Sequence, residues 1–272
     1  MTTPADGLPI EAALASIFRR PVMPAAVTGL AGDASTRRYF RIGLPPGTGR
    51  PSVILMRYPD EVPPGEELPF LNVHRYLLKA RLPVPSVLAH FPSDKSLYLE
   101  DLGDTMVEDR VKSDGAEACR PLYERCIEIL LRLQADGTAA LDGRAIPAKL
   151  AFDVEKFAWE IDFFFEHAVR GYGGIPLSPA DELAIKDLLR PHLERLAALP
   201  RVLAHRDYHS RNVMVRDGGE PVLLDFQDAR MGNVFYDLAS LLRDAYVTLP
   251  DKLESDLAYA WRHAASAGLR KA

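Results

Sequence analysis

The sequence predicts an α+β fold of two lobes, a small lobe built on a β-sheet followed by a mainly helical lobe. Two observations lead to this prediction. Short β-like runs alternate with turns up to about residue 100, and long stretches with apolar residues at helical spacing follow them. The length of 272 residues is sufficient for two lobes that share a cleft. We therefore expect an N-lobe over 1–99, a hinge over 100–104 and a helical C-lobe over 105–272.

In the first lobe, alternating or continuous apolar runs predict strands at 39–42, 52–58, 82–91 and 96–101. Apolar residues at helical spacing predict helices at 9–19 and 66–80. A loop rich in Pro and Gly, 44–51, separates the first two strands. The expected lobe is a small sheet with the helix at 66–80 packed on it.

In the second lobe, three helices are expected before a segment of short strands. Apolar spacing predicts helices at 117–134 and 154–169. The third helix starts after Ser178, a predicted N-cap that forms a capping box with Asp181, and Pro191 is expected to kink or divide it. Strands follow at 202–204, 213–216 and 221–225, before a final helical zone from 236 onward.

The composition is that of a packed globular protein, with 47% hydrophobic and 26% charged residues. The net charge is −5 and no Lys/Arg cluster dominates any stretch, so no nucleic-acid partner is expected. Cys119 and Cys126 stand two helical turns apart, roughly 10 Å, which is too far for a disulfide; buried thiols are expected. The N-terminus lacks a signal-peptide pattern and no stretch reaches ~18 apolar residues, so we expect a cytoplasmic protein without a membrane span.

The segment 202–229 carries three polar residues whose spacing predicts a chemical site. Asp207 precedes a turn, Asn212 opens one short strand, and Asp225 ends the next. The loop 217–219 folds these strands into a hairpin, which would bring Asn212 and Asp225 together. Their side-chain oxygens suit a hard cation such as Mg²⁺. Asp207 would remain free to accept a proton from a substrate hydroxyl.

The run from His205 to Asn212 follows the H-R-D-x-x-x-x-N pattern of the kinase catalytic loop, and Asp225 follows it as a DFG-type aspartate. The short gap between Asn212 and Asp225, together with His209, resembles the aminoglycoside phosphotransferase and choline kinase superfamily. This resemblance implies a two-lobed protein-kinase-like fold and the use of ATP and Mg²⁺. It implies that Asp207 is the catalytic base, with Asn212 and Asp225 as metal ligands.

The other polar residues of this segment are given structural roles. We interpret His205 and His209 as residues that hold the loop in shape. Asp237 is expected to bond within the catalytic loop or to cap the helix that it opens. Asp228 either contacts the substrate or is a solvated surface acid, and the sequence does not decide between these roles. The roles of Arg206 and Arg211 in the loop are also left open.

By the same resemblance, the nucleotide would bind the first lobe at three places. Residues 32–40 match the hairpin that covers the phosphates, with predicted contacts from Ala34, Ser35, Thr36 and Arg38. The strand at 52–58 lacks the expected lysine, and Met56 or Arg57 holds its place. If Met56 faces the cleft, the cation would come from Arg38 or Arg41. Leu99-Glu100-Asp101-Leu102-Gly103 resembles the hinge, where Glu100 and Leu102 would bond the adenine.

A narrower resemblance concerns the acceptor. The strings GDASTRRYFR, LEDLGD, LLDFQDA and YDLASLLRDA resemble those of bacterial anomeric sugar kinases that phosphorylate N-acetylmuramate and N-acetylglucosamine. Members of that family usually extend further past the last of these strings, so some substrate-binding helices are expected to be missing from the sequence. The implied acceptor is the anomeric hydroxyl of an amino sugar, in the recycling of cell-wall peptidoglycan.

Two alternatives stay open. A kinase of aminoglycosides, choline or other amino alcohols would use acids around the acceptor, and the helix at 154–169 offers Glu155, Glu160, Asp162 and Glu166. A nucleotide-binding regulatory pseudokinase would explain the missing lysine, but it would not need Asp207. The sequence leaves the oligomeric state open.

Overall fold

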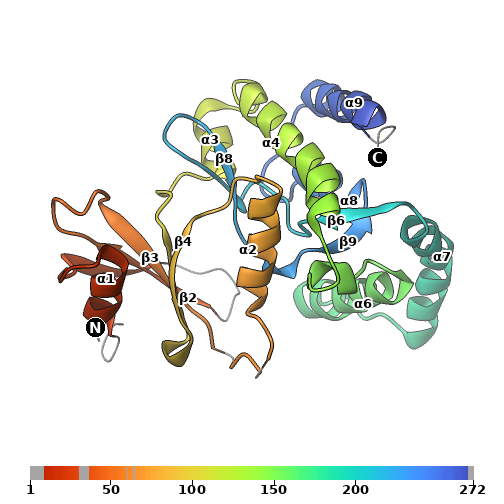
Figure 1. The fold of residues 1–272 in the computed structure, drawn as a ribbon. Helices are drawn as coiled ribbons and strands as arrows, with labels where there is room; N and C mark the ends of the chain where they lie inside the picture. Colours follow the sequence, from red (N-terminus) through yellow and green to blue (C-terminus); the bar gives the residue numbers. More distant parts are fainter. Residues whose placement is uncertain (1–8, 31–36, 60, 64, 269–272) are drawn as a thin grey trace. The chain divides into compact units, whose positions relative to one another are not determined.

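The computed structural model describes residues 9–30, 37–59, 61–63 and 65–268. The chain divides into two compact units, the first made of 1–67 and 85–104 and the second of 68–84 and 105–272. The first contains an antiparallel sheet and the second is mainly helical, so the α+β class is confirmed (Figure 1). No helix among the described residues is long and apolar enough to cross a membrane.

The first unit is a five-stranded antiparallel sheet with one helix. The helix is α1 (Ile10–Phe18), and the strand order is β1-β2-β3-β5-β4. The strands are β1 (Ala26–Leu30), β2 (Arg38–Gly43), β3 (Ser52–Arg57), β4 (Val87–Phe91) and β5 (Ser96–Glu100), with the 3₁₀ turn η1 (Pro92–Asp94) between the last two. Alternation in β2 directs Phe40 and Ile42 to one face, where they form a core with Leu14 of α1. Strand β1 was not predicted from the sequence.

Helix α2 (Pro69–Lys79) lies in the second unit, although the sequence analysis groups it with the sheet. The contacts of α2 explain why it belongs to the second unit. The Asn72 amide donates to the backbone oxygen of Arg144 at 3.2 Å and accepts from the backbone N–H of Ile146 at 2.9 Å. Phe70 packs on Phe226 with ring centroids 4.8 Å apart. These partners lie in segments far along the chain, so the apolar period of the helix alone does not identify them.

Helix α4 (Arg120–Arg132) has one buried face in the second unit and continues into the π turn η2 (Leu133–Gly137) and the short α5 (Thr138–Ala140). Cys126 and Leu130 are fully buried on α4, and Cys119 is buried at its start. Both cysteines are free thiols, as predicted. Before α4 lies α3 (Val107–Asp114), which the sequence analysis missed.

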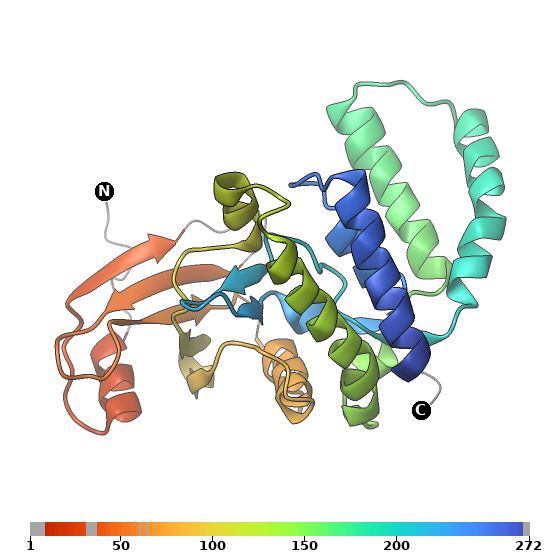
Figure 2. The same cartoon turned by 90° about the horizontal axis from the view of Figure 1, so that it is seen from above.

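Helices α6 (Val154–Phe164) and α7 (Pro179–Ala197) form an antiparallel pair, joined through the π-helical turns of η4 (Phe165–Tyr172) (Figure 2). The prediction that Ser178 caps the third helix is confirmed, because its hydroxyl accepts the backbone N–H of Asp181 at 3.1 Å. Pro191 was expected to kink or divide this helix; α7 continues through it, so the helix is not divided, and the kink stays a prediction.

Two small antiparallel strand pairs support the predicted chemical site. Strand β6 (Arg201–Ala204) pairs with β9 (Arg230–Asn233), and β7 (Val213–Val215) pairs with β8 (Pro221–Leu223). Short 3₁₀ turns, η3 (Pro147–Lys149) and η5 (Phe226–Asp228), flank them. The described part of the unit ends with α8 (Tyr236–Leu242) and α9 (Asp251–Gly268). Strand β9 was not predicted.

Candidate functional site

The β7–β8 hairpin brings the three predicted polar residues together in the second unit. Val213 pairs with Leu223, and the backbone N–H of Leu224 donates to the carbonyl of Asn212 at 2.9 Å. Asp225 is therefore one residue beyond the position opposite Asn212. The Asn212 amide nitrogen donates to the backbone oxygen of Asp207 at 3.0 Å. This bond ties Asn212 to the turn of Asp207 and leaves its amide oxygen as the atom suited to a cation.

Asp225 is exposed at the end of this hairpin, next to the buried Phe226. Its backbone is left-handed, with φ of 55°, an unusual conformation for a residue other than glycine. The next residue, Phe226, is fully buried and packs on Phe70 of α2. The Gln227 amide donates to one carboxylate oxygen of Asp225 at 2.8 Å. The aromatic anchor and this bond hold the carboxylate at the surface in a defined orientation.

A buried carboxylate holds the start of the catalytic loop. Asp237 accepts the backbone N–H of His205 at 2.6 Å and that of Arg206 at 3.0 Å. The prediction that Asp237 bonds within the loop is confirmed. Burial raises the pKa of Asp237 to about 7, against the lowering effect of these two hydrogen bonds. Arg206 itself has a left-handed backbone, with φ of 85°, so the two bonds stabilise a strained turn.

His205 and Tyr208 are buried supports of the loop. His205 is 1% exposed, and burial lowers its pKa to about 4. A neutral imidazole hidden from solvent cannot exchange protons with a substrate, which agrees with the structural role inferred for it. The Tyr208 hydroxyl donates to the backbone oxygen of Cys126 at 2.8 Å and ties the loop to α4.

Two further supports were missed by the sequence analysis. The carboxylate of Glu108, on α3, accepts from Arg211 at 2.7 and 3.2 Å. The carboxylate of Asp244 accepts the backbone N–H of Ser210 at 2.7 Å. These contacts answer the open question about Arg211, which pairs with an acid. Asp244 belongs to the string YDLASLLRDA, seven residues after Asp237, and its place in that string was the signal that could have identified it.

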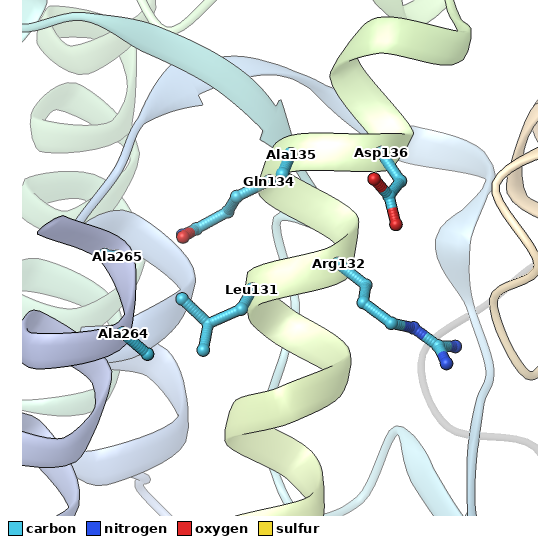
Figure 3. Close-up of a pocket in the computed structure, with 7 residues that line it drawn as sticks. All are labelled: Leu131, Arg132, Gln134, Ala135, Asp136, Ala264 and Ala265. Carbon is cyan, nitrogen blue, oxygen red and sulfur yellow. The ribbon is translucent and has the colours of Figure 1, made fainter. Parts of the chain in front are cut away.

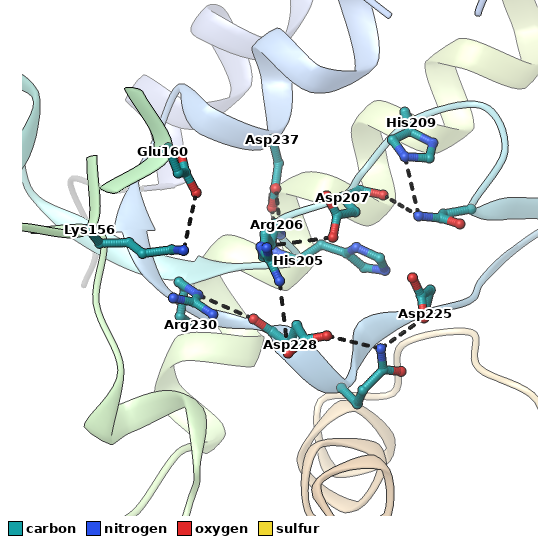
Figure 4. Close-up of polar contacts among 12 residues, drawn as sticks. Lys156, Glu160, His205, Arg206, Asp207, His209, Asp225, Asp228, Arg230 and Asp237 are labelled. Carbon is teal, nitrogen blue, oxygen red and sulfur yellow. Dashed lines mark hydrogen bonds and ion pairs between the residues drawn. The ribbon is translucent and has the colours of Figure 1, made fainter. Parts of the chain in front are cut away.

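The carboxylate of Asp207 points toward the guanidinium of Arg206 (Figure 4). Burial raises the pKa of its carboxyl group; the nearby charge of Asp225 acts in the same direction and that of Arg206 opposes it. The Arg206 guanidinium lies 4.0 Å from the carboxylate of Asp207 and 3.8 Å from that of Asp228. The arrangement can therefore supply a proton acceptor whose protonation state responds to its neighbours.

The predicted nucleotide contacts lie in the first unit, and part of them falls outside the described residues. Ala34, Ser35 and Thr36 are in that undescribed segment. Arg38 is exposed, and Met56 is fully buried. The Glu100 backbone N–H donates to Ser86 at 2.9 Å, and its carboxylate accepts from Ser86 at 3.0 Å; Leu102 is half-buried in the segment after β5.

Arg41 has an unexpected partner in this unit. Its guanidinium donates to both oxygens of Asp101, at 2.6 and 3.0 Å, and also contacts Asp104. Burial of Asp101 acts to raise the pKa of its carboxyl, but hydrogen bonds from Arg41 and Ser52 outweigh burial and lower it. Arg41 thus fastens strand β2 to the segment after β5 that the sequence analysis predicts to be the hinge.

A pocket in the second unit lies between α4, η2 and α9 (Figure 3), where Leu131, Arg132, Gln134 and Ala265 are among its lining residues. Gln134 is held there by hydrogen bonds, since it donates to the backbone oxygen of Val234 and accepts from Trp261. None of the predicted site residues lines this pocket. It is therefore not the site to which the catalytic loop belongs.

The chain is similar in sequence to a known family and to several bacterial proteins. Residues 26–271 match the phosphotransferase enzyme family. An N-acetylmuramate/N-acetylglucosamine kinase of Pseudomonas putida is 32% identical over 246 residues, 90% of this chain and 67% of the relative. A protein of the same name from Neisseria meningitidis is 34% identical, over 89% of this chain and 69% of the relative. The chain thus spans about two thirds of the length of these relatives.

Solved structures with this fold include two kinds of phosphotransferase. An aminoglycoside phosphotransferase in complex with streptomycin and ATP has a TM-score of 0.64 and 13% identity, over 100% of this chain and 86% of that one. A choline kinase of Streptococcus pneumoniae has a TM-score of 0.61 and 15% identity, over 93% and 78%. The predicted protein-kinase-like fold is confirmed. The chain therefore belongs to the phosphotransferase enzyme family and is a small-molecule kinase.

Proposed function

We propose that this protein transfers the γ-phosphoryl group of ATP to the anomeric hydroxyl of an amino sugar, N-acetylmuramate or N-acetylglucosamine, in cell-wall sugar recycling. The catalytic part of the proposal is supported by two hydrogen bonds of Asn212. Its side-chain amide donates to the backbone oxygen of Asp207, and its backbone carbonyl accepts from the N–H of Leu224, the residue before Asp225. The names of the sequence relatives support the acceptor. Family membership implies ATP as the phosphoryl donor.

In this proposal Asp207 is the catalytic base. Its carboxylate accepts the proton of the C1 hydroxyl while the C1 oxygen attacks the γ-phosphorus, the bond from that phosphorus to the bridging oxygen breaks, and ADP leaves. An anomeric hydroxyl is more acidic than an ordinary alcohol, so a carboxylate is a sufficient base. The buried acceptor Asp237 and the anchor Tyr208 keep the base in place, which supplies the positioning that phosphoryl transfer needs.

Asn212 and Asp225 would hold the magnesium ion. An amide oxygen and a carboxylate oxygen are hard donors that suit Mg²⁺, which usually takes few protein ligands and fills its shell with phosphate oxygens and water. Among the residues that the structure describes, no group of three or more His, Cys, Asp or Glu side chains could hold a metal. When bound, the ion would neutralise charge on the ATP phosphates.

The acids proposed for a cationic acceptor are largely neutralised by their neighbours. Glu160 lies 3.7 Å from Lys156, Asp162 pairs with Lys186, and Glu166 lies 3.3 Å from Arg170. A helix face that carries its own cations offers little net attraction to an aminoglycoside or to choline. This favours a neutral or anionic acceptor over an amino alcohol.

The remaining parts of the proposal concern the nucleotide and the compartment. Backbone groups of Glu100 and Leu102 would bind adenine, and residues 34–36 with Arg38 and Met56 would contact the rest of ATP. We also propose the cytoplasm as the compartment, in agreement with the two free thiols.

ATP consumption measured with N-acetylmuramate, N-acetylglucosamine, choline and kanamycin tests the proposal. The expected result is turnover of one or both sugars and of neither amine. Turnover of an amine alone would overturn the acceptor. ATP binding without turnover of any acceptor would favour the regulatory pseudokinase.

A further inference from the structure

A group of cations lies beside the base, on the side formed by α6 and β9. Arg206 contacts Asp207, Arg230 opens strand β9, and Lys156 lies on the first turns of α6. Figure 4 shows the ammonium of Lys156 and the guanidinium of Arg230 on the same side of Arg206. The proposed base thus contacts one cation, Arg206, and two further cations from α6 and β9 lie on the far side of Arg206.

The local fold brings these elements to the base. Ala204, two residues before Arg206, pairs with Arg230 across the β6–β9 ladder. Phe157 stacks on Phe152 with centroids 5.6 Å apart, and Phe152 stacks on Tyr236 at 4.1 Å. This buried aromatic row fixes the start of α6 against the strands. Since Lys156 precedes Phe157, its position beside the loop is set by the core.

Arg230 has no carboxylate partner among the residues that the structure describes. Its Nε donates to the backbone oxygen of Asp228 at 3.3 Å, and its guanidinium lies 5.3 Å from the ring centroid of Phe152. These contacts hold the side chain in a half-buried position without neutralising it. A planar guanidinium fixed in this way is suited to bind a carboxylate with two parallel hydrogen bonds.

Within the part of the chain that the structure describes, Lys156 has one carboxylate neighbour, Glu160 of its own helix, and no direct hydrogen bond closes the ion pair. Its ammonium lies 3.7 Å from Glu160, which is longer than a direct hydrogen bond, and 3.5 Å from the ring centroid of Trp159. Burial lowers the pKa of Lys156; the charges of Arg206 and Arg230 act in the same direction, against that of Glu160. The positive charges of Lys156, Arg206 and Arg230 repel one another at a half-buried position. A bound anion would stabilise their charged forms.

We propose that Arg230 and Lys156 form a subsite for the carboxylate of the acceptor sugar, and that this subsite makes anionic amino sugars better acceptors than neutral ones. The inference rests on the proposed function. Of the two proposed sugars, N-acetylmuramate carries a lactyl carboxylate and N-acetylglucosamine does not. With the C1 hydroxyl of the sugar at Asp207, the lactyl group of N-acetylmuramate would extend past Arg206, toward the side on which Figure 4 shows Arg230 and Lys156.

The test compares the two sugars in the parent protein, in Arg230→Gln and in Lys156→Gln. Arg195→Gln is the matched control, since Arg195 is exposed on α7. In the parent, kcat/KM is expected to be higher for N-acetylmuramate. In Arg230→Gln the ratio of kcat/KM for N-acetylmuramate to that for N-acetylglucosamine falls at least about tenfold, as does the ratio of the two binding constants measured without ATP. Lys156→Gln lowers both ratios in the same direction, and Arg230→Lys restores part of the loss.

Three results would count against the subsite. An unchanged ratio in both Gln variants would overturn it. An equal loss of kcat/KM with the two sugars would also overturn the subsite. It would indicate that Arg230 acts on the transferred phosphoryl group, the other anion present. If Arg230→Gln fails to fold by circular dichroism, Lys156→Gln decides alone. Turnover of choline or kanamycin and of neither sugar by the parent would instead overturn the proposed function, which separates the two failures.

Discussion

Asp237 and Arg206, 31 residues apart, are joined by a 3.0 Å hydrogen bond from the backbone N–H of Arg206 to the buried carboxylate. The same carboxylate accepts the N–H of His205. Replacing Asp237 with Ala would leave both N–H groups buried without an acceptor. We expect a loss of about 3 kcal/mol in the free energy of unfolding, measured by urea denaturation, and a large fall in kcat.

Asp187→Ala is the matched control for that variant. Asp187 is exposed on α7, and its replacement is expected to change the free energy of unfolding by less than about 0.5 kcal/mol. If Asp237→Ala unfolds at the same urea concentration as the parent and keeps its kcat, the carboxylate does not support the loop.

The pH dependence of the reaction follows from the surroundings of Asp207. Burial raises the pKa of this carboxyl, and only its ionised form can accept a proton. Activity is therefore lost as pH falls through a pKa that lies above the ordinary aspartate value. Arg206 lowers this pKa, so Arg206→Gln is expected to move the acid limb of the kcat/KM profile to higher pH. Arg195→Gln is the control. If the acid limb of the Arg206→Gln profile stays in place, or moves no further than that of Arg195→Gln, Asp207 is not the group that titrates.

Magnesium dependence tests the proposed metal ligands. Asp225→Asn keeps the shape of the side chain but removes its charge, so the Mg²⁺ concentration for half-maximal rate is expected to rise at least about tenfold. Asp217→Asn, an exposed change in the turn of the same hairpin, serves as the control and is expected to leave that concentration unchanged. Removal of the metal with EDTA should abolish turnover in the parent. Equal Mg²⁺ dependence in all three proteins would remove Asp225 from the metal site.

The pair of Arg41 and Asp101 is expected to stabilise the sheet unit. The Asp101 side chain is 8% exposed, so Arg41→Gln leaves a nearly buried carboxylate without its main partner. We expect a loss of about 2 kcal/mol, discounted for the partial exposure of Arg41. Because the pKa of Asp101 is lowered in the folded protein, this stabilisation is present above its unfolded pKa and disappears as pH falls through the lowered value.

Denaturation of Arg41→Gln and the parent at neutral and acid pH measures this effect. The two proteins should differ at neutral pH and converge in acid. Arg50→Gln, an exposed change in the same unit, should match the parent throughout. A difference that grows in acid would show that the guanidinium does not stabilise the ionised carboxylate.

The hairpin that brings Asn212 and Asp225 together was the part best predicted from the sequence. This hairpin is local, with polar residues at fixed spacing around a Gly-Gly turn, so a short segment contains the information. The elements that support it depend on distant partners. Strand β1 buries no residue and has no apolar period, and α3 is highly charged; Glu108 of α3 is buried because it pairs with Arg211. Strand β9 is defined by pairing with β6, where Gly232 lies against Phe152.

The central claim is that Asp207 accepts the proton in phosphoryl transfer and is not needed to bind ATP. The most direct measurement follows ³¹P resonances of ATP and an amino sugar with the parent and with Asp207→Asn, alongside ATP affinity by calorimetry. We predict a sugar 1-phosphate from the parent, no product from the variant, and ATP affinity within about threefold of the parent, well under 1 kcal/mol. A variant that still forms the product, or that no longer binds ATP, would contradict the role assigned to this residue.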